Sequence, residues 1–162
     1  MKPQYKSSSR MGVTWVFLFS LCLAPFGLSA QITNIPDQNF EQTLIDLGID
    51  SDNTVNGQVL TSDVETITTL IIKYKNISDL TGIEDFAALQ NLDITGNQLT
   101  LLQISENLEL KTLICNVNPL DSIDLSQNVL LENLELQVVH TLDNIDLSNN
   151  RRRLYGNRIF QF

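Results

Sequence analysis

The residues best suited to hold a metal ion lie in a short polar segment, residues 50–57, which reads DSDNTVNG. Its oxygen-bearing side chains alternate along the chain, as they do in calcium-binding loops. The EF-hand spacing fails, because Thr54 stands at the fifth position and Val55 replaces the glycine of the sixth. A polar turn that joins two helices is the simpler interpretation, and calcium binding stays open as the alternative. We otherwise expect no metal site and no cofactor.

No set of side chains has the pattern of a catalytic site. His140 is the only histidine, and no serine or cysteine nucleophile stands in a recognisable motif with it. Cys115 occupies a repeated position that Ile94 and Leu136 hold elsewhere, which indicates a small buried hydrophobic residue rather than a reactive thiol. The sequence has no glycine-rich phosphate loop. We therefore predict that the protein is not an enzyme.

The amino-terminal residues predict export. The segment 1–30 begins with a basic region, continues with the uncharged apolar run 13–24, and ends in small residues at Ala30. This is the layout of a secretory signal peptide, with cleavage expected after Ala30. An uncleaved membrane anchor is the alternative, although the apolar run is shorter than the roughly 20 residues of a spanning helix. We expect a secreted or cell-surface protein with no membrane span after cleavage.

The net charge excludes one class of partner. Removal of Lys2, Lys6 and Arg10 with the signal peptide changes the formal net charge from −9 to −12, since three positive charges leave. A body this acidic repels phosphate backbones, so we expect no nucleic acid partner.

The strongest signal is an internal repeat. The pattern L-x-[LIC]-x-x-N-x-L begins at Leu92 and Leu113, and a variant of it begins at Leu134, with a period of 21 residues. A nested half-unit recurs around Ile104 and Leu125. Five asparagines mark the corners of the half-turns: Asn97, Asn107, Asn118, Asn128 and Asn150. Stacked turns of this kind bury a continuous core, and each corner amide can bond neighbouring backbone groups. We expect residues 67–150 to form short parallel β-strands on both long sides of a right-handed coil, with little helix.

These motifs resemble the leucine-rich-repeat family. Residues 32–150 are similar to its nested 21-residue class, sometimes called IRREKO, and residues 80–89 (LTGIEDFAAL) resemble the first turn of internalin-type proteins. The order of signal peptide, cap and nested repeats resembles exported proteins of the Bacteroidetes. The resemblance implies a leucine-rich-repeat solenoid that binds protein or glycan at the cell surface, and it implies no particular ligand.

The two ends of the repeat array differ in character. Residues 31–66 predict a helical cap, with a helix from Asp37 to Gly48 that buries Phe40, Leu44 and Leu47. A second short helix is expected near residue 61, where Ser62 and Glu65 fit a capping box. Residues 151–162 fit no further turn, so we expect an atypical, disordered tail. This break indicates a truncated or frameshifted gene, and a basic-aromatic tail that covers the open end is the alternative.

The outward face of the leading strands is the candidate ligand-binding surface. Nine side chains would form three rows there: Asn91, Asp93 and Thr95; Thr112, Ile114 and Asn116; Asn133, Glu135 and Gln137. Solenoids bind along such extended surfaces, although solvated strand faces have the same pattern. Two functions therefore stay open, a monomeric extracellular binding module for protein or glycan, and a structural or non-functional remnant of a longer adhesin-like protein.

Overall fold

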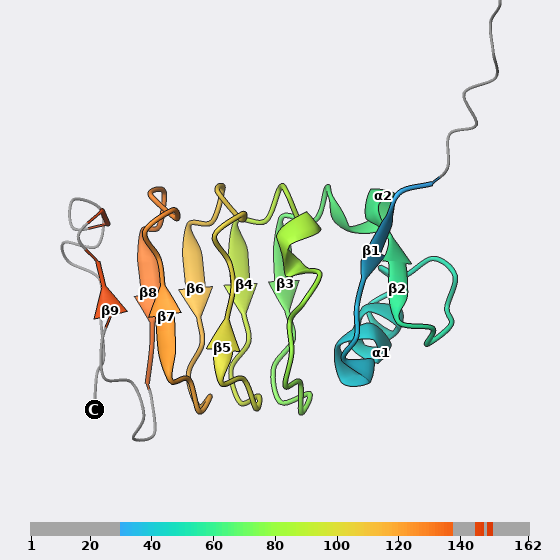
Figure 1. The fold of residues 1–162 in the computed structure, drawn as a ribbon, viewed down its shortest axis with the longest axis horizontal. Helices are drawn as coiled ribbons and strands as arrows, with labels where there is room; N and C mark the ends of the chain where they lie inside the picture. The colour runs from blue at the N-terminus through green and yellow to red at the C-terminus, as the bar shows by residue number, and fades with distance from the viewer. Residues whose placement is uncertain (1–29, 138–144, 148, 151–162) are drawn as a thin grey trace, which may run out of the picture.

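The computed structural model describes residues 30–137, 145–147 and 149–150. Residues 1–29 of the predicted signal peptide, His140 and residues 151–162 lie outside these ranges. Figure 1 shows two rows of short strands that follow one another along a coil, with a small helical unit at the amino-terminal end.

The amino-terminal unit contains two helices and an antiparallel strand pair. Its elements are β1 (Ile32–Asn34), α1 (Gln38–Asp46), β2 (Gln58–Leu60) and α2 (Thr61–Val64), and β1 pairs with β2. Asp37 caps α1, because its side chain accepts the backbone N–H groups of Asn39 and Phe40. This cap agrees with the prediction from the sequence, whereas the strand pair was not predicted.

Two details of the predicted cap are wrong. Leu47 is 50% exposed, because α1 ends at Asp46 and the chain turns away at Gly48, where φ is +68°. The capping box of Ser62 and Glu65 does not form, because α2 begins at Thr61 directly after β2 and Ser62 already lies inside the helix.

The repeats form two parallel sheets on opposite sides of the coil. The first sheet has the order β3 (Thr69–Ile71), β4 (Asn91–Asp93), β6 (Thr112–Ile114) and β8 (Asn133–Glu135). The second has the order β5 (Leu101–Leu102), β7 (Ser122–Asp124) and β9 (Ile145–Asp146). In the first turn, the 3-10 helix η1 (Ile83–Asp85) precedes the second sheet. Strands on both long sides agree with the nested repeat.

The core consists of inward side chains that stack from turn to turn. One column of the first sheet holds Leu70, Leu92, Leu113 and Leu134, which are paired in register and buried. The next column includes Ile94, Cys115 and Leu136, all with no exposed surface. The rings of Phe40 and Phe86 stack with centroids 6.2 Å apart, so α1 and the first turn share this core.

The corner asparagines form two buried columns. Asn97 and Asn118 follow the first sheet, and Asn107, Asn128 and Asn150 follow the second. Asn97 donates to the carbonyls of Ile72 and Ile94, one in the preceding turn and one in its own. Each amide therefore satisfies backbone carbonyls that the tight corner would leave without a partner.

Candidate binding face

The first sheet carries the surface that the repeat pattern predicts as the binding site. We call its outward side the ladder face and define it by residues 69, 71, 73 and 74 together with the nine predicted residues. The register places Asn91, Thr112 and Asn133 in one row across three strands. A second row holds Asp93, Ile114 and Glu135, and Thr95, Asn116 and Gln137 follow the strands. The fold thus brings the nine predicted side chains onto one surface.

Asp93 and Thr95 are less accessible than the repeat pattern suggested. Asp93 is 7% exposed, and its Oδ2 lies 2.6 Å from Nζ of Lys73. Asp93 Oδ1 also accepts the hydroxyl of Thr95 at 2.7 Å. The hydrogen bond and charge of Asp93 raise the pKa of Lys73 above its usual value of 10.5. Asp93 is therefore engaged within the face before any ligand arrives.

The first strand adds a row that the nine predicted residues do not include. Ile71 on β3 pairs in register with Asp93 and is 56% exposed. Tyr74, three residues after β3, is 69% exposed. It lies against Gly96 of the next turn, where a methyl group in place of the glycine hydrogen would meet the Tyr74 ring. Leu70 lies 22 positions before Leu92 and marks an earlier inward position of the repeat, so this additional row could have been predicted from the sequence.

The remainder of the ladder face is made largely of amides and hydroxyls. Gln137 donates its backbone N–H to Oδ1 of Asn116 at 2.8 Å, and Asn116 donates to Oε2 of Glu135. Because Lys73 balances Asp93, Glu135 supplies the main negative charge of the nine predicted residues. Such a surface offers many hydrogen-bond donors and acceptors around two exposed apolar groups.

Two further groups considered from the sequence are metal ligands and the Cys115 thiol. No group of three or more His, Cys, Asp or Glu side chains in the described part of the chain could hold a metal ion. Burial, and secondarily the charge of Asp93, raises the pKa of the Cys115 thiol to about 12, so the reactive thiolate is strongly disfavoured.

Several side-chain oxygens of the polar segment 50–57 accept hydrogen bonds from within the segment, whereas Oδ2 of Asp50 is buried without a hydrogen-bond partner. Asp52 accepts the N–H of Thr54 through Oδ1 and the amide of Asn56 through Oδ2. Oε1 of Glu41 accepts the N–H groups of residues 56, 57 and 58 at 2.8–3.1 Å. These bonds order the polar turn around the buried side chain of Glu41, whose Oε2 has no hydrogen-bond partner.

Among the residues described, no helix has the length and apolar character required to cross a membrane.

Comparison with known proteins gives structural matches only. No protein-family model and no curated protein matches the sequence. The solved structures that it resembles include the functional domain of InlJ from Listeria monocytogenes, with 23% identity over 82% of this chain and a TM-score of 0.60. Internalin C2 from the same organism has 20% identity over 80% of this chain and a TM-score of 0.60. The internalin InlF has 24% identity over 68% of this chain and a TM-score of 0.56.

The chain folds as a leucine-rich-repeat solenoid. It spans 28% of the InlJ chain, 34% of the InlF chain and 61% of the internalin C2 chain. The likeness to internalins agrees with the internalin-type first turn at residues 80–89. At these identities the likeness shows the fold alone.

Proposed function

We propose that the protein is a non-catalytic extracellular binding module that holds a protein or glycan ligand on the ladder face. The observation that carries this proposal is the exposed pair Ile71 and Tyr74 beside rows of amide and hydroxyl groups on one solenoid surface. Apolar anchors next to hydrogen-bonding groups are the usual composition of a binding hot spot. The predicted signal peptide at residues 1–30 supports an extracellular location. We further propose a monomer with a cap at 31–66 and repeats at 67–150.

Binding to arrays of purified extracellular proteins and glycans tests this function. We expect a ligand whose affinity falls by about tenfold or more when Ile71→Ser and Tyr74→Ala are combined, because both anchors leave the interface. The matched control is Leu108→Ser, since Leu108 is 52% exposed at a corner away from the ladder face. Thermal unfolding of each variant checks that the solenoid remains intact.

The charge of Glu135 provides an independent readout. Glu135→Lys should change the association rate and its salt dependence, whereas Glu109→Lys at an exposed corner should change neither. The ladder face is not the binding site if the ligand still binds the combined Ile71→Ser and Tyr74→Ala variant but no longer binds Leu108→Ser.

A further inference from the structure

The corner that follows the first sheet carries an exposed aromatic ring. Among the described aromatic residues, Phe40 and Phe86 are buried, whereas Tyr74 is 69% exposed. The side of the Tyr74 ring that carries Cδ1 and Cε1 lies against Gly96 of the next turn, where a Cβ atom would overlap both ring atoms. The glycine therefore leaves the space in which the ring lies across the corner.

Backbone hydrogen bonds place Tyr74, Gly96 and Val117 at the same position of successive turns. The N–H of Tyr74 donates to the carbonyl of Thr95, and the N–H of Gly96 donates to the carbonyl of Asn116, each at 2.9 Å. Val117 follows the same pattern and is 47% exposed. We call these three residues the corner shelf, which adjoins the ladder face. It extends over two strand spacings, or roughly 10 Å.

The backbone of Tyr74 indicates that its ring has a role other than packing. Its φ is +55°, in the left-handed region that is unfavourable for a bulky side chain. Because most of the ring is exposed, little apolar surface is buried in compensation. Strained residues of this kind are concentrated at ligand-binding sites. An exposed ring at a strained position therefore points to a ligand contact.

Polar side chains lie directly beside the corner shelf. The residues that precede its members in the sequence are Lys73, Thr95 and Asn116, and they belong to the ladder face. Thr95 is buried, and Lys73 forms an ion pair with Asp93. Asn116 is half-buried and donates to Oε2 of Glu135 at 3.4 Å, so its amide has bonding capacity left for a ligand. The site thus combines an apolar surface with hydrogen-bonding groups along one side.

A sugar unit has surfaces that match this combination. One face of a pyranose ring presents C–H groups, which pack on an aromatic ring, and its rim carries hydroxyl groups that donate and accept hydrogen bonds. With the C–H face on Tyr74, the hydroxyl groups lie toward Lys73 and Asn116. An aromatic anchor of a protein interface usually fills a closed pocket, whereas Tyr74 stands on an open corner. The chemistry of the corner shelf therefore favours a glycan over a protein.

The charges near the corner shelf favour an uncharged sugar. The ammonium group of Lys73 is balanced by Asp93 at 2.6 Å, and Glu135 adds a negative charge on the same face. The whole chain has a formal net charge of −9. A carboxylate or sulfate group on the sugar would be repelled by these charges.

We propose that the corner shelf binds a neutral sugar unit of a glycan, which stacks on Tyr74 and bonds to Lys73 and Asn116. This inference rests on the function proposed for the ladder face and narrows its ligand from protein or glycan to neutral glycan.

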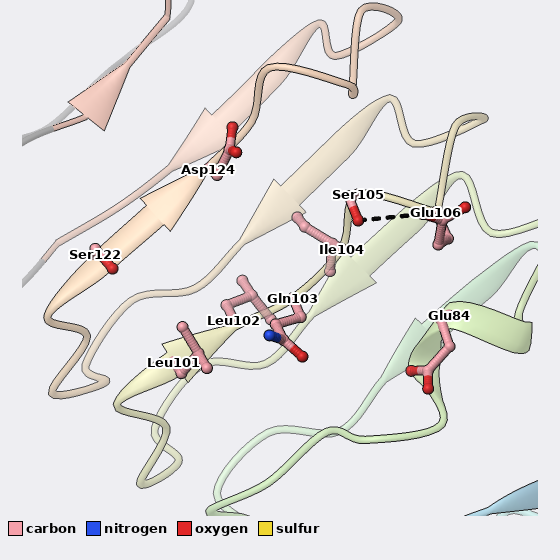
Figure 2. Close-up of a pocket in the computed structure, with 9 residues that line it drawn as sticks. All are labelled: Glu84, Leu101, Leu102, Gln103, Ile104, Ser105, Glu106, Ser122 and Asp124. Carbon is pink, nitrogen blue, oxygen red and sulfur yellow. Dashed lines mark hydrogen bonds between the residues drawn. The ribbon is translucent and has the colours of Figure 1, made fainter.

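A hollow on the second sheet is the alternative position for a sugar. Figure 2 shows this hollow, which has a volume of about 470 Å³ and lies on the opposite side of the coil. Its lining residues include three carboxylates, those of Glu84, Glu106 and Asp124, and no aromatic ring. The hollow therefore lacks the stacking surface that the corner shelf has, and Leu101, which lines it and is 55% exposed, gives a control position there.

The test follows the fluorescence anisotropy of labelled hexasaccharides titrated with the full chain. The neutral probes are hexamers of glucose, mannose and N-acetylglucosamine, and the charged probe is a hexamer of galacturonic acid. We expect saturable binding of at least one neutral hexamer and binding of the galacturonic acid hexamer that is about tenfold weaker or absent.

Variants of the ring test the stacking contact. Tyr74→Leu keeps an apolar side chain but lacks the ring, so it should bind the neutral hexamer about tenfold more weakly or worse. Tyr74→Phe restores the ring and should recover most of the affinity. The matched control is Leu101→Ser in the hollow, which should leave the affinity unchanged. Thermal unfolding of each variant checks that the solenoid is intact.

Four results would overturn the proposal. Equal affinities of Tyr74→Leu and Tyr74→Phe would show that the ring does not stack on the sugar. Loss of binding in Leu101→Ser with retention in Tyr74→Leu would place the sugar in the hollow of the second sheet. Tighter binding of the galacturonic acid hexamer would contradict a neutral ligand. Failure of every hexamer to bind would remove the sugar assignment.

The protein arrays then separate this failure from that of the proposed function. A protein ligand that the combined Ile71→Ser and Tyr74→Ala variant no longer binds would leave the ladder face as a binding site, with a protein as its ligand. Absence of any protein or sugar ligand that depends on these two residues would overturn both proposals.

Discussion

The carboxylate of Asp37 accepts two hydrogen bonds from Ser78, a residue 41 positions later in the chain. Asp37 Oδ2 lies 2.8 Å from the backbone nitrogen and 2.8 Å from the hydroxyl oxygen of Ser78. Its other oxygen, Oδ1, caps α1. One side chain thus holds the start of the cap helix and the loop of the first turn at the same time.

Removal of this carboxylate should separate the cap from the first turn. We expect Asp37→Ala to lower the free energy of unfolding by about 2–4 kcal/mol, since a helix cap and charge-assisted bonds are lost together. Ser78→Ala removes only the hydroxyl bond and should cost about 1 kcal/mol. Urea unfolding at pH 7 measures both. Equal losses in the two variants would show that Asp37 acts through Ser78 alone.

Asp37 should also contribute to the pH dependence of the free energy of unfolding. Burial alone would raise the pKa of Asp37, but hydrogen bonds from Ser78, Phe40 and Asp79 hold it below the usual value of 3.8. A carboxyl group with a lowered pKa in the folded state stabilises the protein above its unfolded pKa, and this is lost as pH falls through the folded pKa. The acid-induced loss of stability below pH 4 should therefore be smaller in Asp37→Ala than in the natural chain.

Asp50 should act in the opposite direction. Burial first, and then the charges of Asp52, Glu41 and Asp63, raise its pKa above 3.8, although a bond from the Asp52 N–H lowers it. The folded state then binds the proton more tightly than the unfolded state, so stability falls as pH rises from 3.8 through the folded pKa.

The substitution Asp50→Asn removes this penalty and keeps an oxygen for the Asp52 N–H. It should raise the free energy of unfolding at pH 7 and change it little at pH 3, as measured by urea unfolding at both values. Asp121→Asn at an exposed corner is the control and should change neither. A loss of stability at pH 7 in Asp50→Asn would contradict the raised pKa.

The corner asparagines should be essential to the stack. Asn128 donates to the carbonyls of Ile104 and Asn107 at 2.8 and 3.0 Å and has no exposed surface. Asn128→Ala leaves both buried carbonyls without this donor, so we expect a cost of about 1–3 kcal/mol. Gln127→Ala, on the exposed neighbouring position, should be nearly neutral. Chemical denaturation compares them, and equal effects would argue against the structural role of the corner amide.

The sequence predicts those parts of the fold that repeat. Leu92, Leu113 and Leu134 mark the inward column because each turn imposes the same packing requirement. The strand pair β1–β2 occurs only once among the described residues, so the spacing of apolar residues in the sequence contains no periodic pattern that predicts it. The register of the repeats also predicted that the nine ladder residues share one surface. Their solvent accessibility depends on contacts between side chains of different turns, such as Lys73 with Asp93, and the sequence of one repeat does not reveal such contacts.

The same limit applies to the first turn. Residues 80–89 resemble an internalin-type turn, but only the structure shows that this turn carries the 3-10 helix η1 and, among the described residues, no strand of the second sheet. Tyr74 was missed for a related reason. Its place against Gly96 follows from the stacking of two turns, whereas its neighbours in the sequence give no sign of it.

Val117 provides a test of backbone strain in the repeat. Its φ is +56°, a left-handed conformation that costs a β-branched residue roughly 1–2 kcal/mol, and the same corner of the preceding turn holds Gly96 with φ of +72°. Val117 is 47% exposed, so it has little packing to lose. We expect Val117→Gly to leave the free energy of unfolding unchanged or raise it by up to about 1 kcal/mol, since glycine relieves the strain at the cost of a freer unfolded chain.

Val129 is 50% exposed and is absent from the positive-φ positions, so Val129→Gly should instead lower stability. Urea unfolding of the two variants isolates the backbone effect, because the side chain removed is the same, and an equal loss in both would show that the left-handed corner stores no strain.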